Sequence, residues 1–260
     1  MRLRGLLFVV VAVASAVTVT LVQAPAQWLA ALVHSATGAR VLLAEPSGTL
    51  WSGKATLVLS AGGSAPSPLR ASLPEPLSWR LSPWALLAGR IDLTLSHPSA
   101  LAQPLTVQAR LGGRVDIGPA RLQLPAALLI GLGAPWNTIR PGGVLVITWD
   151  KLTLDGGRLQ GHMTGEWQLA SSALTPVSPF GHYRVQTNGV FPGTQLNLVT
   201  VSGPLELTGS GTIGEGGRLR FQGLARAAPG TDPAVKTQLN GLISLLGRRD
   251  GEAAILNIGS

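Results

Sequence analysis

The sequence predicts a mainly β fold, an antiparallel meander or curved sheet with a few short helices, preceded by one N-terminal transmembrane helix. Three observations support this prediction. A long uncharged apolar run follows two arginines at the amino terminus, apolar and polar residues alternate with a period of two through much of the remaining chain, and glycine-rich turns separate the alternating segments. Long helical segments are missing between these segments, so parallel crossovers are not expected.

The amino-terminal run predicts a membrane anchor. Arg2 and Arg4 precede an apolar stretch from Gly5 to Val22, and the next charged residue is Arg40. At a rise of about 1.5 Å per residue, a helix over this stretch reaches ~27 Å, close to the thickness of a bilayer core. The apolar side chains expected to contact lipid are Leu6, Leu7, Phe8, Val9, Val10, Val11, Val13, Val17, Val19, Leu21 and Val22.

The two arginines also predict the orientation of the chain. Positively charged flanks stay in the cytoplasm, so residues 1–24 are expected to form a cytoplasmic tip and an anchor in the cell inner membrane. Residues 25–260 are then a periplasmic β-rich domain of a single-pass protein. A cleaved signal peptide is the alternative, because Val22-Gln23-Ala24 has the small-residue pattern of a cleavage site, although Pro25 would follow the cut. In both cases the main part of the protein is exported.

Composition excludes several classes of function. The chain has no cysteine, which excludes a disulfide framework, a cysteine-ligated zinc site and thiol catalysis. The formal net charge is +8, but the arginines are scattered singly and are not interleaved with aromatic residues as in a surface that binds single strands. We therefore expect no nucleic-acid binding.

The exported part is expected to begin with a short helix from Gln27 to Val41 and to continue as strands. The clearest alternation runs from Arg158 to Leu169, with an apolar face that includes Leu159, Met163 and Trp167. Other alternating runs lie at residues 56–59, 91–96, 105–111, 144–149, 183–187, 196–201, 205–213 and 219–225. Turn signals such as Gly112-Gly113 and Asn188-Gly189 separate them, which predicts about eight to eleven strands whose sequence neighbours pair.

Three short helices are expected to interrupt the strands. Residues 82–87 and 125–132 both place a proline near the first helical position, and Asp232-Pro233 opens a third helix with apolar residues on one stripe, followed by a last strand at 254–258. Residues 61–76 are rich in Pro, Ser and Gly, and a mobile loop is expected there.

The sequence offers no catalytic, metal or cofactor site. His162 and Glu166 lie on the polar face of one predicted strand, but their backbones are roughly 13 Å apart at about 3.3 Å per residue, too far to share an ion without other elements. His34, His97 and His182 are isolated and are expected at the surface or in turns. Trp51 is expected to be a buried anchor at a strand start, with a partner contact as the alternative.

Several stretches, taken in order, resemble the type II secretion system protein N (GspN) family. After the basic and apolar start they are Gly48-Thr49-Leu50-Trp51-Ser52-Gly53, Leu77-Ser78-Trp79-Arg80-Leu81-Ser82-Pro83, Leu124-Pro125-Ala126-Ala127-Leu128-Leu129, Gly142-Gly143, Thr148-Trp149 and Leu245-Leu246-Gly247-Arg248-Arg249-Asp250-Gly251. The resemblance implies a non-enzymatic accessory component of the machine that exports folded proteins across the bacterial outer membrane, without cofactors and with other secretion subunits as partners.

Two hypotheses for function remain open. The first is a scaffold or partner-binding subunit of the secretion apparatus, because exposed strand edges accept partner strands. The second is a lipid- or envelope-handling module similar to AsmA-like proteins, in which the sheet curls into a trough and leaves its apolar face open to a lipid ligand. The extent to which the three helices cover that face separates the two hypotheses.

Overall fold

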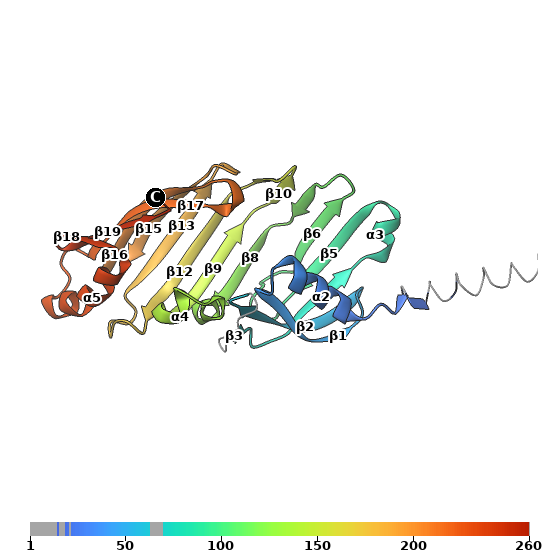
Figure 1. Cartoon of the computed structure of the whole chain (residues 1–260), viewed down its shortest axis with the longest axis horizontal. Helices are drawn as coiled ribbons and strands as arrows, with labels where there is room; N and C mark the ends of the chain where they lie inside the picture. The colour runs from blue at the N-terminus through green and yellow to red at the C-terminus, as the bar shows by residue number, and fades with distance from the viewer. Residues whose placement is uncertain (1–14, 16–18, 21, 63–69, 260) are drawn as a thin grey trace, which may run out of the picture.

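Two antiparallel sheets make up most of the computed structural model, which describes residues 15, 19–20, 22–62 and 70–259 (Figure 1). The first sheet has ten strands in the order β1-β2-β4-β5-β6-β7-β10-β11-β14, with β3 paired to β2. Its strands are β1 (Val41–Gly48), β2 (Ser52–Ser60), β3 (Arg70–Ser72), β4 (Leu77–Leu81), β5 (Arg90–Ser96), β6 (Leu105–Arg110), β7 (Val115–Ile117), β10 (Leu152–Asp155), β11 (Arg158–Gln160) and β14 (Val190–Phe191).

The second sheet has nine strands in the order β18-β19-β17-β16-β15-β13-β12-β9-β8. Its strands are β8 (Ala120–Pro125), β9 (Pro141–Trp149), β12 (Met163–Ser172), β13 (Gly181–Asn188), β15 (Thr194–Ser202), β16 (Leu205–Ile213), β17 (Leu219–Ala227), β18 (Arg248–Asp250) and β19 (Ala253–Ile258).

Four long strands bend and contribute one half to each sheet. The halves are β7 with β8, β9 with β10, β11 with β12 and β13 with β14, and only one or two residues separate the halves of each. Gly161 (φ 134°) and Gly189 (φ 106°) lie at two of the bends, where a side chain would strain the backbone. When the halves are joined, both sheets form one meander, as the sequence predicts. The expected number of eight to eleven strands was too low, partly because these bends divide four long strands and partly because short strands such as β3 and β18 were not predicted.

The strand predicted from Arg158 to Leu169 is interrupted twice. It stops at Gly161-His162, between β11 and β12, and a register shift follows between Trp167 and Ala170. Leu169 lies in this bulge with a φ of 51° and is 65% exposed. The prediction that Leu169 shares the buried face is therefore wrong, because a bulge adds one residue and turns the next side chain outward.

The helices are short and mostly lie where the sequence predicts them. They are α2 (Ala26–Ala36), α3 (Pro83–Leu87), the 3-10 helices η1 (Ala126–Leu132) and η2 (Glu215–Gly217), α4 (Trp136–Ile139) and α5 (Pro233–Leu246). The helix expected to reach Val41 ends at Ala36, because Gly38 and Ala39 adopt positive φ and β1 begins at Val41. The segment 61–76, for which a loop was expected, contains β3, and its residues 63–69 lie outside the described residues.

The membrane anchor stays a prediction. Among the described residues, every helix is too short or too polar to cross a bilayer. Of the expected anchor residues only Val19 and Val22 are described, and both are exposed (54% and 62%). The remaining ones, Leu6, Leu7, Phe8, Val9, Val10, Val11, Val13, Val17 and Leu21, lie outside the described residues.

Candidate functional site: an apolar trough and an outer amide face

Cross-strand register places the apolar side chains of the meander on one face, which we call the inward face. In the first sheet Leu93 pairs with Val107, Val107 with Ile117, and Ile117 with Leu152. One rung of the second sheet crosses eight strands, and its members are Leu122, Ile147, Gly165, Val185, Leu198, Gly209, Gly223 and Leu256. Neither rung contains a charged side chain. Side chains alternate between faces along every strand, and the charged residues of these strands occupy the outward positions.

Helices cover the two ends of the inward face. At one end α2 packs against β1, β2 and β4, where Ala26 lies with Ala55 and Trp79 in a buried cluster. At the other end α5 places Leu239, Leu242 and Ile243 over the second sheet, where they form a core with inward residues of β13, β16, β17 and β19. Burial of apolar area contributes about 25 cal/mol per Å² to the free energy of unfolding, so α2 and α5 stabilise the two ends of the inward face.

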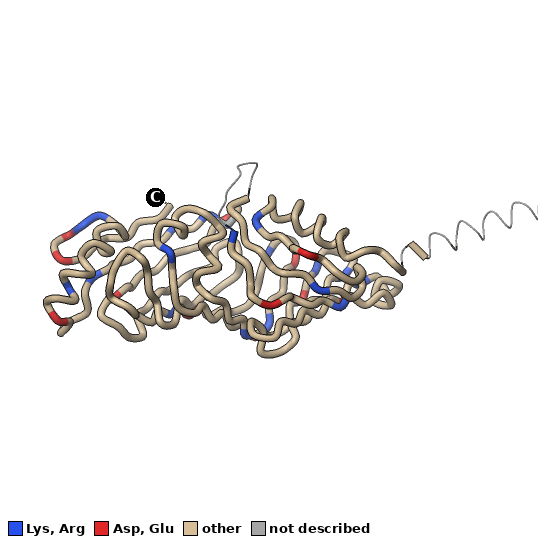
Figure 2. Tube along the Cα trace, turned by 90° about the horizontal axis from the view of Figure 1, so that it is seen from below, with Lys and Arg blue, Asp and Glu red and all other residues tan. Residues whose placement is uncertain are grey.

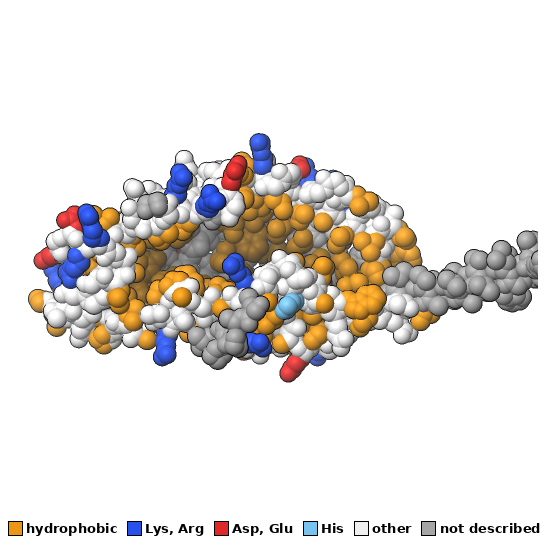
Figure 3. All heavy atoms as spheres, viewed as in Figure 1, with side chains coloured by type: hydrophobic (Ala, Val, Ile, Leu, Met, Phe, Trp, Pro, Cys, Tyr) orange, Lys and Arg blue, Asp and Glu red, His pale blue; other side chains and the backbone are white. Residues whose placement is uncertain are grey.

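Between α2 and α5 the inward face is open, and we call this part the trough. Figure 3 shows it as a hollow lined by hydrophobic side chains on the face that carries α2 and α4. Its lining residues share apolar chemistry, an inward position and partial or high exposure to solvent. They are Ile91, Leu105, Val107, Val115, Ile117, Leu154, Leu159, Met163, Val185, Phe191, Leu196, Ile213 and Leu219.

Gly165 shows that the floor of the trough is hollow. It lies on the inward face between Ile147 and Val185, and a Cβ atom built on it meets no atom within 4 Å. The glycines at 209 and 223 differ, because a Cβ atom there would come within 3 Å of the Phe221 ring. Space is therefore filled by Phe221 near β16 and β17 and is left empty at β12.

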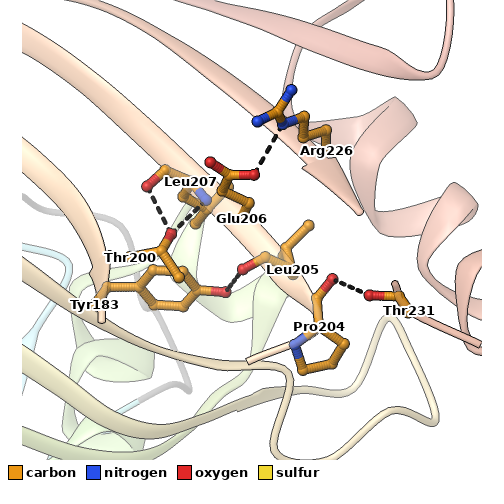
Figure 4. Close-up of polar contacts among 8 residues, drawn as sticks. All are labelled: Tyr183, Thr200, Pro204, Leu205, Glu206, Leu207, Arg226 and Thr231. Carbon is orange, nitrogen blue, oxygen red and sulfur yellow. Dashed lines mark hydrogen bonds and ion pairs between the residues drawn. The ribbon is translucent and has the colours of Figure 1, made fainter. Parts of the chain in front are cut away.

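Polar atoms of the inward face bond to the backbone and leave no free polar group at these positions. The indole Nε1 of Trp149 donates to the carbonyl of Gly118 at 2.8 Å. The Tyr183 hydroxyl donates to the carbonyl of Leu205 at 2.9 Å, and the Thr200 hydroxyl donates to the carbonyl of Leu207 at 2.8 Å (Figure 4). Burial raises the pKa of the Tyr183 hydroxyl, so this group stays neutral. The inward face is thus apolar in chemistry as well as in sequence.

Alternate turns of a meander lie at the same edge, and one edge of this meander is basic. The turns that follow β4, β6, β10 and β16 share this edge, while η1, α4 and α5 lie at the opposite edge (Figure 1). The basic edge carries Arg90, Arg110, Arg114, Arg158 and Arg218, together with the carboxylates Asp155 and Glu215. Two of these arginines are paired, Arg90 with Asp92 at 3.2 Å and Arg114 with Asp116 at 3.4 Å. Each arginine of the basic edge is next in sequence to an inward apolar residue, so its side chain leaves the strand on the outer face, at the rim of the trough. Over the whole described chain the basic residues are more widely spread (Figure 2).

The outer face of the second sheet carries a polar hollow, which we call the amide face. It is open to solvent, has a volume of about 820 Å³ and is formed by side chains of β13, β15, β16, β17 and β19. Its polar members are Asn188, Gln195, Asn197, Ser210, Thr212, Arg220, Gln222 and Asn257. Side-chain amides both donate and accept hydrogen bonds, so this surface, in which Arg220 is the charged member, is suited to contact with a polypeptide. This surface was not predictable from the sequence, since it arises from registers such as Asn197 beside Ser210.

A charged cluster lies on the outer face around Glu166. Its carboxylate accepts from Arg184 Nε at 2.9 Å and from Gln168 Nε2 at 2.8 Å, and it lies 3.3 Å from His182 Nε2. The hydrogen bond from Gln168, followed by that from Arg184, lowers the pKa of Glu166. His162, which the sequence places on the same face, is exposed in the bend before β12 and is absent from this cluster. In the part of the chain that the structure describes, no three His, Asp or Glu side chains are grouped to hold a metal ion.

We expect the stabilising contribution of Glu166 to be lost in acid. Its pKa lies below the ordinary 4.5 in the folded state, so its contribution is present above that pH and is lost as the pH falls through the folded-state pKa. The Glu166→Gln variant should lower the free energy of unfolding by about 1–2 kcal/mol at neutral pH and weaken the acid dependence. Urea unfolding on both sides of that pH measures this, with the exposed Glu252→Gln as the control. Equal losses in both variants would contradict the role of the cluster.

Three candidate residues from the sequence remain, namely His97, His34 and Trp51. His97 is 3% exposed, and its Nδ1 accepts from the backbone N–H of Ala100 at 3.0 Å, which stabilises the turn after β5. His34 is exposed near the end of α2, and Trp51 is partly exposed just before β2.

Comparison with known proteins gives one match. The family model described as type II secretion system (T2SS), protein N, matches residues 39–255. No curated protein sequence and no solved structure shows significant similarity to this chain.

Proposed function

Because the chain belongs to the type II secretion system protein N family, we propose that it is a non-enzymatic, partner-binding component of the secretion apparatus. The match over residues 39–255 carries this proposal, since it includes nearly the whole β domain and both of its ends. In this proposal the amino-terminal segment holds the chain at the inner membrane, and the β domain works in the periplasm. Its partners are other subunits of the apparatus.

The amide face is the surface that we assign to these partners. It is hollow, it is formed by five adjacent strands, and apart from Arg220 its polar side chains are uncharged. Among the described residues, none of its side chains is engaged in a hydrogen bond or an ion pair with a neighbour. Such a surface binds a partner without first breaking internal contacts. Its affinity for the partner also depends less on ionic strength than that of a charged surface.

The strand edges fit a partner less well. β18 is short, all three of its residues are exposed, and Arg248 and Arg249 lie on it, a feature that protects edges from pairing. β1 carries Glu45 at a positive φ of 52° and a register shift before Ser47, which interrupts its ladder. Both devices disfavour addition of a partner strand at these edges.

Photocrosslinking in cells that make the secretion apparatus tests this proposal. A photoreactive phenylalanine analogue replaces Asn197 on the amide face, and a matched variant replaces Gln108, which lies on the outward face of β6. We expect Asn197 to crosslink to another subunit of the apparatus and Gln108 to remain without such a product. The Gln222→Arg change, made in the Asn197 variant, should abolish the crosslink.

Two results would contradict the proposal. One is the same crosslinked subunit from both positions, which would show no preference for the amide face. The other is the absence of any secretion subunit from Asn197 while the variant protein is folded and present at normal levels.

A further inference from the structure

The trough has the properties of a binding site for a molecule that is apolar over most of its length and anionic at one end. We propose that it binds the acyl chains of an anionic phospholipid, with the phosphate group at the basic edge. This inference goes beyond the secretion role and does not depend on it, because it rests on the inward face, whereas the partner contact rests on the outer one.

The chemistry of the lining favours an acyl chain over a polypeptide. Every rung of the inward face belongs to a paired ladder, so the backbone beneath the trough offers no free hydrogen-bonding group to an added strand. The indole N–H groups of Trp149 and Trp167 are also engaged, since each Nε1 donates to a backbone carbonyl at 2.8 Å. A peptide placed here would leave its own N–H and C=O groups without partners, which is costly, whereas an acyl chain has none.

The shape of the molecule leaves room for such a chain. α2 and α5 close the two ends, and the inward position at Gly165 between them is empty to a radius of 4 Å. Residues around this position, including Met163 and Val185, remain partly exposed although they are apolar. A continuous exposed apolar surface of this kind usually marks a site that is covered in use.

The basic edge supplies charge complementarity for the head group. Arg90 and Arg110 lie directly opposite each other on β5 and β6, and like charges in this position destabilise a strand pair. Arg90 is compensated by Asp92 at 3.2 Å, but among the described residues Arg110 has no ion pair. A phosphate near Arg110 would relieve the repulsion, and Ile91 and Ala109 on the inward side would then contact the first part of the acyl chain.

Exposed apolar side chains lie at the same corner. Trp84 (77%) and Leu87 (81%) project from α3, and Leu111 (86%) projects from the turn after β6. The backbone N–H of Leu111 donates to the carbonyl of Gly89 at 3.0 Å, so the two segments are held together. Exposed Trp and Leu beside arginines are typical of surfaces that enter the interfacial layer of a membrane, which gives the lipid a route to the trough.

Photolabelling tests this inference with the full-length chain. The protein is reconstituted in vesicles of phosphatidylethanolamine and phosphatidylglycerol that contain a phosphatidylglycerol with a diazirine on its acyl chain. Labelled residues are located by mass spectrometry after irradiation. We expect labels on the trough, at or near Leu159, Met163 and Val185.

Two matched variants distinguish the trough from the outer face. Gly165→Trp places a large side chain in the empty position, and Gln186→Trp places the same side chain on the outward face of the neighbouring strand. Gly165→Trp should lower labelling of the trough at least about fivefold, because it fills the space, while Gln186→Trp should leave it unchanged. Both variants should melt cooperatively, since the backbone at Gly165 has an ordinary φ.

The head-group site has its own readout. Arg110→Gln should reduce labelling by the phosphatidylglycerol probe and leave labelling by a diacylglycerol probe, which lacks phosphate, unchanged. Labels confined to the amino-terminal segment and α3, or equal trough labelling in the wild type and Gly165→Trp, would overturn the inference. Trapping of a protein instead of lipid by a photoreactive residue at position 159 would also overturn it, in favour of a polypeptide ligand.

Discussion

Replacing Trp167 by alanine is expected to lower the free energy of unfolding by about 3–5 kcal/mol, a large fraction of the stability of an ordinary domain. The indole packs edge-on against Phe180, with ring centroids 5.5 Å apart and an interplanar angle of 87°, and it lies 6.1 Å from the Tyr183 ring. Its Nε1 also donates to the carbonyl of Gly142 at 2.8 Å. The substitution therefore removes an aromatic contact, opens a cavity and leaves a carbonyl without its donor.

The matched control is Trp84→Ala, which removes the same side chain from a position that is 77% exposed. Its effect on the free energy of unfolding should stay within about 0.5 kcal/mol. Urea unfolding of the full-length chain in a mild detergent, followed by circular dichroism in the far ultraviolet, measures both variants. Similar losses for Trp84 and Trp167 would contradict the assignment of the Trp167 cluster to the core.

Period-two alternation predicts most of the meander, because each strand in it has one apolar and one polar face. The segments 91–96, 105–110 and 205–213 all form strands whose apolar residues lie inward. Leu111, which the same pattern includes, lies instead in the turn after β6 and is 86% exposed. Local capping signals predict α5 equally well, and the Asp232 carboxylate accepts from the backbone N–H of Ala234 at 2.7 Å.

The bends and the bulge were not predictable from alternation. Gly161 interrupts the segment 158–169 without disturbing the pattern of its side chains, since Leu159 and Met163 both remain inward. Leu169 fits the same pattern but is turned outward by a register shift with β9 and β13, which depends on strands distant in sequence. The bends therefore divide the predicted antiparallel meander between two sheets.

The openness of the trough also depends on tertiary structure. An apolar residue in an alternating run reads the same whether a helix covers it or not. Leu205 and Leu159 illustrate this, since both are inward leucines, but Leu205 is fully buried beside α5 whereas Leu159 remains partly exposed. Only the placement of α2, η1, α4 and α5 decides which part of the inward face is covered. The amide face is not recognisable in the sequence for a related reason, because its members come from five strands.

Cysteine reactivity measures the openness of the trough most directly, and the absence of native cysteine makes the experiment clean. Leu159→Cys places a thiol in the trough, Leu205→Cys places one under α5, and Gln186→Cys places one on the outer face. In the full-length, folded protein we expect a maleimide to modify the thiols at 159 and 186 at least about tenfold faster than the thiol at 205.

Loading with phosphatidylglycerol should then slow the reaction at position 159 and leave position 186 unaffected. If the thiol at 159 instead reacts as slowly as the one at 205 in lipid-free protein, the inward face is closed and there is no trough to bind lipid.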